Sequence, residues 1–334
     1  MKALIALCAV IGLAIIAWVG VSMAGLESVF GIVVPYAAIA IFLVGFVVKV
    51  IGWARAPVPF RITTVAGQAK SLPWIERQPL ESPFTTWETI GRMALEVFFF
   101  RSLWRNSRAT VLRDHQRVAY VSDKILWAAG LAFHVAFLVI FLRHLRFFLE
   151  PTPVFVTALE HMDGFFQLAV PAVFMTDAII VLAVGALLVR RLIEPQLRYL
   201  SLPADYFALF LLLGVAFTGI SMRYVTRADI TGAKALAMGL VTFQPTIPEG
   251  IGAPFYLHVF FVSLLFAYFP FSKLMHMGGV FLSPTRNLAN NNRAVRHVNP
   301  WNPPYDVIKP HTYEEWEEEF HDKLKAAGYT LERE

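Results

Sequence analysis

The sequence predicts an all-α integral membrane protein with six transmembrane helices. Of its 334 residues, 57% are hydrophobic and 16% are charged, whereas a soluble domain is about 45–50% apolar and about 25% charged. A helix needs about 20 apolar residues to cross a bilayer core of about 30 Å, and six such runs occur. They are residues 3–24, 29–53, 125–148, 165–189, 206–222 and 255–275.

The first run follows Met1 and Lys2, as the apolar part of a secretion signal would. Its length of about 20 residues exceeds the roughly 7–15 residues of a signal-peptide core. We therefore expect residues 1–53 to form two retained transmembrane helices.

The single cysteine, Cys8, limits the chemistry of the chain. It excludes a disulfide scaffold, an iron–sulfur cluster held by this chain alone and covalent c-type haem attachment.

Lysine and arginine are distributed unevenly and predict the topology. Eleven lie in residues 54–124, three in 190–198 and four more directly after the sixth run, in 286–309. With six spans these segments fall on one side, which the positive-inside rule makes the cytoplasm. Both termini are then cytoplasmic. Membrane topology accounts for the net charge of +5, so the expected partner is the lipid bilayer and not nucleic acid.

The regions between the runs divide the rest of the chain. We expect residues 54–124 to form a cytoplasmic loop with an interfacial helix near 94–104, since a dense apolar stretch there has basic flanks. Residues 125–277 form a four-helix membrane region, and residues 278–334 form a cytoplasmic tail. Helical spacing of apolar residues in 313–327 predicts an amphipathic helix, which packs on its own protein or docks on a cytoplasmic partner.

Four of the nine histidines lie in the apolar runs or directly beside one. His134 and His144 are ten residues apart in the third run, and His258 of the sixth run is eighteen residues from His276, which directly follows that run. Ionisable residues in a membrane are costly and usually functional. On a continuous helix, eighteen residues make about five turns, so His258 and His276 would share one face roughly 27 Å apart.

The third and sixth runs cross the membrane in opposite directions, so each histidine of the third run lies at the same depth as one of the other two histidines. His134 pairs with His276 toward the cytoplasm (the inner pair), and His144 pairs with His258 toward the outside (the outer pair). Each pair offers two axial imidazoles to a haem iron without any cysteine, with the two irons about 21 Å apart in depth. A zinc site, which normally needs four ligands together, and a proton relay are the alternatives.

The histidine spacing resembles that of the nitrate reductase gamma-subunit type of dihaem cytochrome b. The resemblance covers roughly residues 29–278, so the first run is an addition to a five-helix core. Two cytoplasmic stretches, GQAKSLPWI at 67–75 and RMALEVFFFRSLWRN at 92–106, further resemble the DsrM family of membrane cytochromes in Dsr electron-transfer complexes of sulfur-metabolising prokaryotes.

This resemblance implies a function and partners. It implies two haem b groups, held by His134 with His276 and by His144 with His258, and menaquinone as substrate. It also implies a cytoplasmic iron–sulfur partner of the heterodisulfide-reductase type (DsrK-like), a periplasmic multihaem cytochrome c, and further membrane and iron–sulfur subunits (DsrJ-, DsrO- and DsrP-like). The chain would then be an electron-transfer subunit without a complete catalytic site.

Further candidate residues follow from their depth. Haem propionates need cations near the membrane faces. The candidates are Arg143, Arg146 and Arg223 for the outer haem and Arg117, Lys124 and Lys273 for the inner haem, with snorkelling as the alternative role.

Quinol oxidation needs a proton acceptor, and His161 and Asp163 precede the fourth run at the depth of the outer pair. Asp177, in that run, is protonated, paired to a hydroxyl such as that of Thr176, or part of a proton path.

Two other functions remain open. The first is a cytochrome subunit of a nitrate-reductase, Hme-type or hydrogenase-linked complex, against which the segments 67–75 and 92–106 argue. The second is a haem-free, proton-coupled membrane protein. A colourless purified protein would favour the second.

Overall fold

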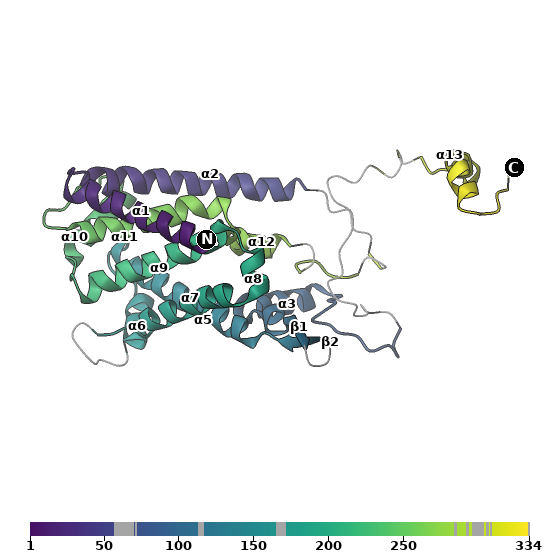
Figure 1. The fold of residues 1–334 in the computed structure, drawn as a ribbon, viewed down its shortest axis with the longest axis horizontal. Helices are drawn as coiled ribbons and strands as arrows, with labels where there is room; N and C mark the ends of the chain where they lie inside the picture. The colour runs from purple at the N-terminus through teal and green to yellow at the C-terminus, as the bar shows by residue number, and fades with distance from the viewer. Residues whose placement is uncertain are drawn as a thin grey trace.

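The computed structural model describes residues 1–56, 70, 72–112, 117–164, 172–283, 286–291, 294–295, 304, 307 and 309–332. Residues 165–171, which begin the predicted fourth span, and most of residues 67–71 lie outside the described residues. The structure is mostly helical (Figure 1). Its long helices are α1 (Lys2–Ser22), α2 (Val34–Ala54), α3 (Thr86–Phe99), α5 (Lys124–His144), α7 (Met175–Ile193), α9 (Pro203–Tyr224), α10 (Ile230–Val241), α11 (Ala253–Tyr268) and α13 (Tyr313–Ala326).

Within the described residues, five helical segments are long and apolar enough to cross a membrane. They are Lys2–Ser22, Val29–Ala54, Lys124–Phe147, Pro203–Tyr224 and Ala253–Phe271. The predicted count of six is therefore not confirmed. The helix in the fourth position, α7, carries Asp177, Arg190 and Arg191 and packs against α5 and α9 inside the bundle.

Two predicted spans are not continuous α-helices. A π-helical turn, Val29–Val33, precedes α2, whose first turn contains a proline. In the sixth span α11 ends at Tyr268, and two 3-10 turns, Phe269–Phe271 and Lys273–Met275, lead into α12 (His276–Leu282). Pro270 in the first of these turns has no N–H to continue the α-helical ladder. The expectation of five uninterrupted turns between His258 and His276 was therefore wrong.

Two segments that separate predicted spans also contain helices. The first holds α6 (Val154–Asp163), and the second holds α10. The Asp229 side chain accepts hydrogen bonds from the backbone amides of Thr231 and Gly232, which is a favourable N-cap. These short helices cover one end of the bundle, opposite the end that carries α8 (Pro195–Leu200) and α12 (Figure 1).

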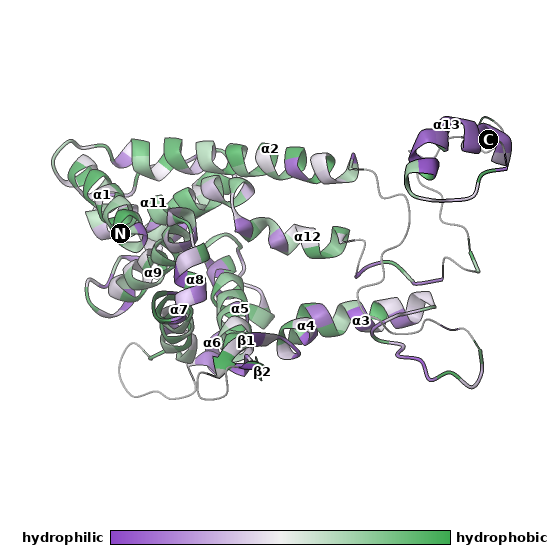
Figure 2. Cartoon of the chain, turned by 45° about the vertical axis from the view of Figure 1, so that its right-hand side comes forward, coloured by the Kyte–Doolittle hydropathy of each residue, from purple (hydrophilic) through white to green (hydrophobic). Residues whose placement is uncertain are grey.

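The segment between the second and third spans is more structured than predicted. A capping box of Thr85 and Glu88 starts α3 earlier than expected, and Phe100, at φ 52°, separates it from α4 (Arg101–Trp104). An unpredicted antiparallel hairpin follows, with β1 (Ser107–Leu112) paired to β2 (Arg117–Ser122). In Figure 2, α3 and α4 run along the direction of α2.

The main core lies where α1, α5, α7, α9 and α11 meet. Its buried residues are Val10, Ala136, Ile180, Val184, Leu211, Leu212, Phe261 and Leu265. Helix α2 lies at the edge of the bundle, and much of its apolar surface is exposed, as on Leu43, Val44 and Val48. The helices of the bundle are mostly hydrophobic in Figure 2, and many large apolar side chains are exposed, so the bundle is suited to a lipid surrounding. Helix α13 lies well apart from the bundle in Figure 1.

Candidate functional site: two histidine pairs

The structure brings the inner pair together. His134 lies in α5 and His276 begins α12, and the centroids of their rings are 5.8 Å apart. His134 Nδ1 lies 2.7 Å from the Gly130 carbonyl oxygen, and His276 Nδ1 lies 2.9 Å from the Lys273 carbonyl oxygen. In both rings the Nδ1–H thus donates to the backbone, which leaves Nε2 as the free lone pair.

The outer pair joins His144, the last residue of α5, to His258 in α11. The ring centroids of His144 and His258 are 6.4 Å apart. His144 Nδ1 lies 2.7 Å from the Ile140 carbonyl oxygen. His258 Nδ1 lies 2.9 Å from a side-chain oxygen, Thr218 Oγ1.

These separations fit two imidazoles that share one metal ion. A metal–imidazole bond of about 2 Å on each side puts the two nitrogens about 4 Å apart and the ring centres about 6 Å apart. Metal-binding histidines also anchor the other ring nitrogen to an acceptor, as all four do here. Among the described residues, no group of three or more histidine, cysteine or carboxylate side chains is placed to hold a metal ion, so each pair offers two ligands.

Two aromatic rings crowd the inner pair, one from the segment between the second and third spans and one from α5. The rings of Phe100 and Phe133 contact the His134 ring edge-on, with centroids 4.9 and 4.8 Å away. Phe100 has a left-handed backbone, which is rare for a bulky residue and often marks a functional position. The sequence alone does not single out Phe100, since nothing in its neighbours signals the backbone conformation.

A buried polar network lies beside the outer pair. Arg143, next to His144 in the chain, is only 7% exposed. Its Nε lies 3.1 Å from Asp163 Oδ2 and its Nη2 lies 3.6 Å from Asp177 Oδ1. The Thr176 hydroxyl accepts from Arg143 Nη2 at 3.1 Å and donates to Asp163 at 2.6 Å. This network ties α5, α6 and α7 together.

Helix α9 closes the network from the other side. The Tyr224 hydroxyl donates to Asp177 Oδ2 at 2.7 Å. Arg223 Nη2 donates to the Ala172 carbonyl at 3.0 Å, and the Arg143 and Arg223 guanidiniums lie 3.7 and 3.8 Å from the centre of the Phe174 ring. Asp177 is therefore paired with an arginine and a tyrosine, and the hydroxyl that donates to it is that of Tyr224 rather than that of Thr176.

The other predicted propionate partners are mostly engaged by protein groups. At the outer end Arg146 pairs with Glu160 at 2.8 Å. At the inner end Lys273 pairs with Asp205 at 2.6 Å, and Lys124 donates to the Trp104 carbonyl. Arg117 is exposed on β2.

The structure separates the two predicted quinone-site residues. Asp163 is buried in the network described above, at 4% exposure, whereas His161 is on the exposed side of α6. The structure does not bring the two into one open site.

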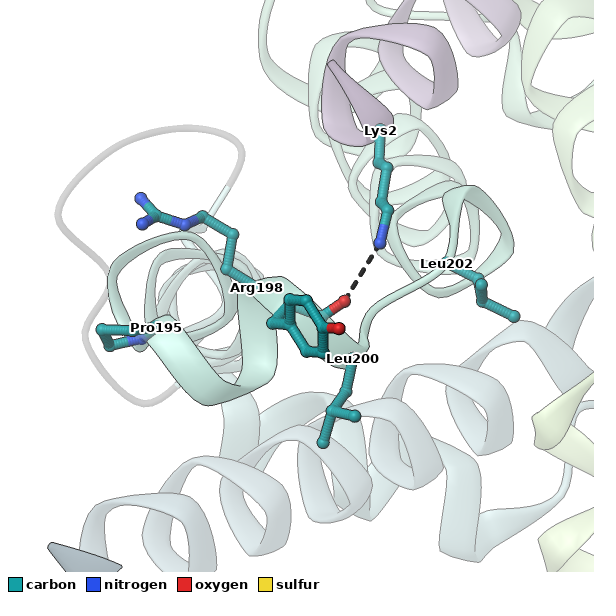
Figure 3. Close-up of a pocket in the computed structure, with 6 residues that line it drawn as sticks. Lys2, Pro195, Arg198, Leu200 and Leu202 are labelled. Atoms are coloured by element: carbon teal, nitrogen blue, oxygen red, sulfur yellow. Dashed lines mark hydrogen bonds between the residues drawn. The ribbon is translucent and has the colours of Figure 1, made fainter.

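A surface groove lies beside α8, away from the four histidines. It is lined by Lys2, Pro195, Arg198, Tyr199, Leu200 and Leu202, and Figure 3 shows the Lys2 ammonium reaching the Tyr199 carbonyl, at 3.0 Å. This contact ties the start of α1 to α8. The groove takes no part in the histidine site.

The fold and the site together define a multi-pass helical membrane protein with two pairs of facing histidines. The model of the nitrate reductase gamma subunit family matches residues 84–297, and the chain belongs to that family. It is 47% identical over 282 residues to the Hdr-like menaquinol oxidoreductase cytochrome b-like subunit of Archaeoglobus fulgidus. The alignment covers 82% of this chain and 84% of the relative. It is 40% identical over 276 residues to the protein of the same name from Archaeoglobus profundus, which covers 80% and 81%.

Proposed function

We propose that the chain is the dihaem b-type cytochrome subunit of a membrane menaquinol oxidoreductase. In this function it takes electrons from menaquinol and passes them to a cytoplasmic iron–sulfur partner of the heterodisulfide-reductase type. The names of the two relatives and membership of the gamma-subunit family support this function.

The observation that carries the proposal is the geometry of the two histidine pairs. Both ring separations, 5.8 and 6.4 Å, suit bis-histidine ligation. A b-type haem would supply one-electron transfer at each pair. The chain itself holds each imidazole through its Nδ1–H, which leaves Nε2 free to bind the iron.

The proposed docking site of the iron–sulfur partner is the segment that contains α3 and α4. Arg101 and Arg105 both form ion pairs with Glu81, and Arg92 Nη1 donates to the Glu81 carbonyl at 2.9 Å. This cluster holds in place the segment that carries Phe100, whose ring contacts His134. A partner docked on α3 and α4 would therefore lie close to the inner pair.

The resemblance of residues 92–106 to Dsr cytochromes extends the proposal to sulfur respiration. On this basis the partners are a DsrK-like iron–sulfur subunit, a periplasmic multihaem cytochrome c and the DsrJ-, DsrO- and DsrP-like subunits.

Menaquinol oxidation is proposed at the outer end, beside His144 and His258. Asp163 is already engaged by Arg143 and Thr176. Of the two candidate proton acceptors, His161 is thus the accessible one. Replacing His161 by alanine should slow haem reduction by a menaquinol analogue without changing haem content.

A pyridine haemochrome assay with reduced-minus-oxidised spectra tests the function. The purified full chain should carry two b haems, and His144→Ala should carry one. His161→Ala is the matched control and should keep both. A wild-type protein without haem would end the cytochrome proposal and favour a haem-free, proton-coupled membrane protein.

A further inference from the structure

One of the four histidines is anchored differently from the others. His134 and His144 bind the carbonyl four residues earlier in α5, and His276 binds the carbonyl three residues earlier. His258 alone is held by a side chain of another helix, Thr218 of α9. The anchor of this ring therefore depends on how α9 packs against α11.

The hydrogen bonds of Thr218 determine the direction of this contact. Thr218 Oγ1 lies 2.7 Å from the Gly214 carbonyl and 3.0 Å from the Val215 carbonyl. Because carbonyls only accept, the single hydroxyl proton is directed to them. The Oγ1 lone pair then accepts from His258 Nδ1–H at 2.9 Å. This arrangement fixes the tautomer in which His258 Nε2 is unprotonated.

Close packing of the two helices makes the contact possible. A Cβ at Gly214 would lie 3.0 Å from Phe261 Cε2, and a Cβ at Gly219 would lie 3.2 Å from His258 Cε1. Gly214 and Thr218 are four residues apart, which is the spacing of small residues that lets membrane helices approach closely. The glycines thus allow α9 to bring the Thr218 hydroxyl within reach of the ring.

The same helix also contacts the residues beside the other outer histidine. Six residues after Thr218, Tyr224 donates to Asp177, and Asp177 pairs with Arg143, the neighbour of His144. Helix α9 therefore supports both members of the outer pair, one directly and one through the buried network.

We propose that Thr218 is a positioning residue that fixes the tautomer of His258 and sets the reduction potential of the outer haem. The inference rests on the proposed function. An acceptor at Nδ1–H raises the basicity of the ligating imidazole, and a more basic ligand favours ferric iron. Loss of the hydroxyl should therefore raise the outer potential and leave the inner potential unchanged.

The test compares Thr218→Val, Thr218→Ser and Thr242→Val in the full chain, within native membranes. Valine removes the hydroxyl at similar volume, and serine keeps it. Thr242, the C-cap residue of α10, is the matched control, because its hydroxyl donates to the Met238 and Gly239 carbonyls in the same pattern. The readouts are an optical redox titration and the low-spin ferric signals in electron paramagnetic resonance.

In Thr218→Val we expect one of the two titration steps to move upward, by about 59 mV for each tenfold loss of ferric over ferrous affinity. The matching ferric signal should change, while Thr218→Ser and Thr242→Val resemble wild type. Selective loss of the outer haem in Thr218→Val, with retention in Thr218→Ser, would also support the inference.

Two outcomes would overturn it while leaving the cytochrome function intact. An unchanged titration of Thr218→Val with both haems present would mean that the Val215 carbonyl, which lies beside the ring, replaces the hydroxyl. Equal shifts of both steps would mean a general loosening of the bundle. Absence of haem in the wild type would instead refute the proposed function itself.

Discussion

Arg143→Met tests how much the buried network contributes to the bundle. Arg143 is buried and faces the buried carboxylate of Asp163 and the partly buried carboxylate of Asp177, with nitrogen–oxygen distances of 3.1 Å and 3.6 Å. At an effective dielectric constant of about 20, each attraction is about 5 kcal/mol before desolvation. Since removal of one partner leaves a buried charge uncompensated, we expect a net loss of about 3–5 kcal/mol.

Thermal unfolding in detergent measures this loss, together with Asp163→Asn and the double variant Arg143→Met/Asp163→Asn. With roughly 2–4 °C per kcal/mol for medium-sized domains, Arg143→Met should lower the melting temperature by at least about 6 °C. The double variant should be less destabilised than the sum of the single variants, because the neutral amide no longer needs a cation. Additive losses, or a shift in Arg143→Met of under about 2 °C, would refute the reasoning.

Three further predictions concern packing, pH and the inner pair. Gly45→Ala should destabilise the protein by about 1–3 kcal/mol, because the new Cβ would lie 2.7 Å from Pro270 Cβ, whereas Gly12→Ala meets nothing within 4 Å and should be neutral or stabilising in a melting experiment. Burial raises the pKa of Glu88, but two backbone amides and an arginine outweigh this effect and hold its pKa below the ordinary value. The carboxylate thus stabilises the start of α3 above the unfolded pKa of about 4.3, and the protection of α3 amides from hydrogen exchange should be lower in Glu88→Gln at neutral pH, with the difference vanishing as the pH falls through the folded pKa. Phe100→Ala should alter only the inner haem spectrum, since the Phe100 ring contacts His134; a change confined to the outer haem would contradict this assignment.

The amino-acid sequence by itself was enough to predict a membrane protein and to select four histidines as candidate ligands. Apolar runs and the low share of charged residues identify a membrane chain, because hydrocarbon solvates few other compositions. Histidines within such runs are few and costly, so His134, His144, His258 and His276 could be selected without a structure. Opposite directions of their helices were enough to match them in depth.

Only the tertiary structure decided how these residues meet and what surrounds them. Pro270 breaks the helix between His258 and His276, so that their positions depend on two 3-10 turns rather than on helical periodicity. The partners of Asp177 and His258 come from α9, 47 and 40 residues away in the chain. Hydrogen bonds and ion pairs between helices depend on interhelical distance and side-chain direction, and local sequence patterns specify neither.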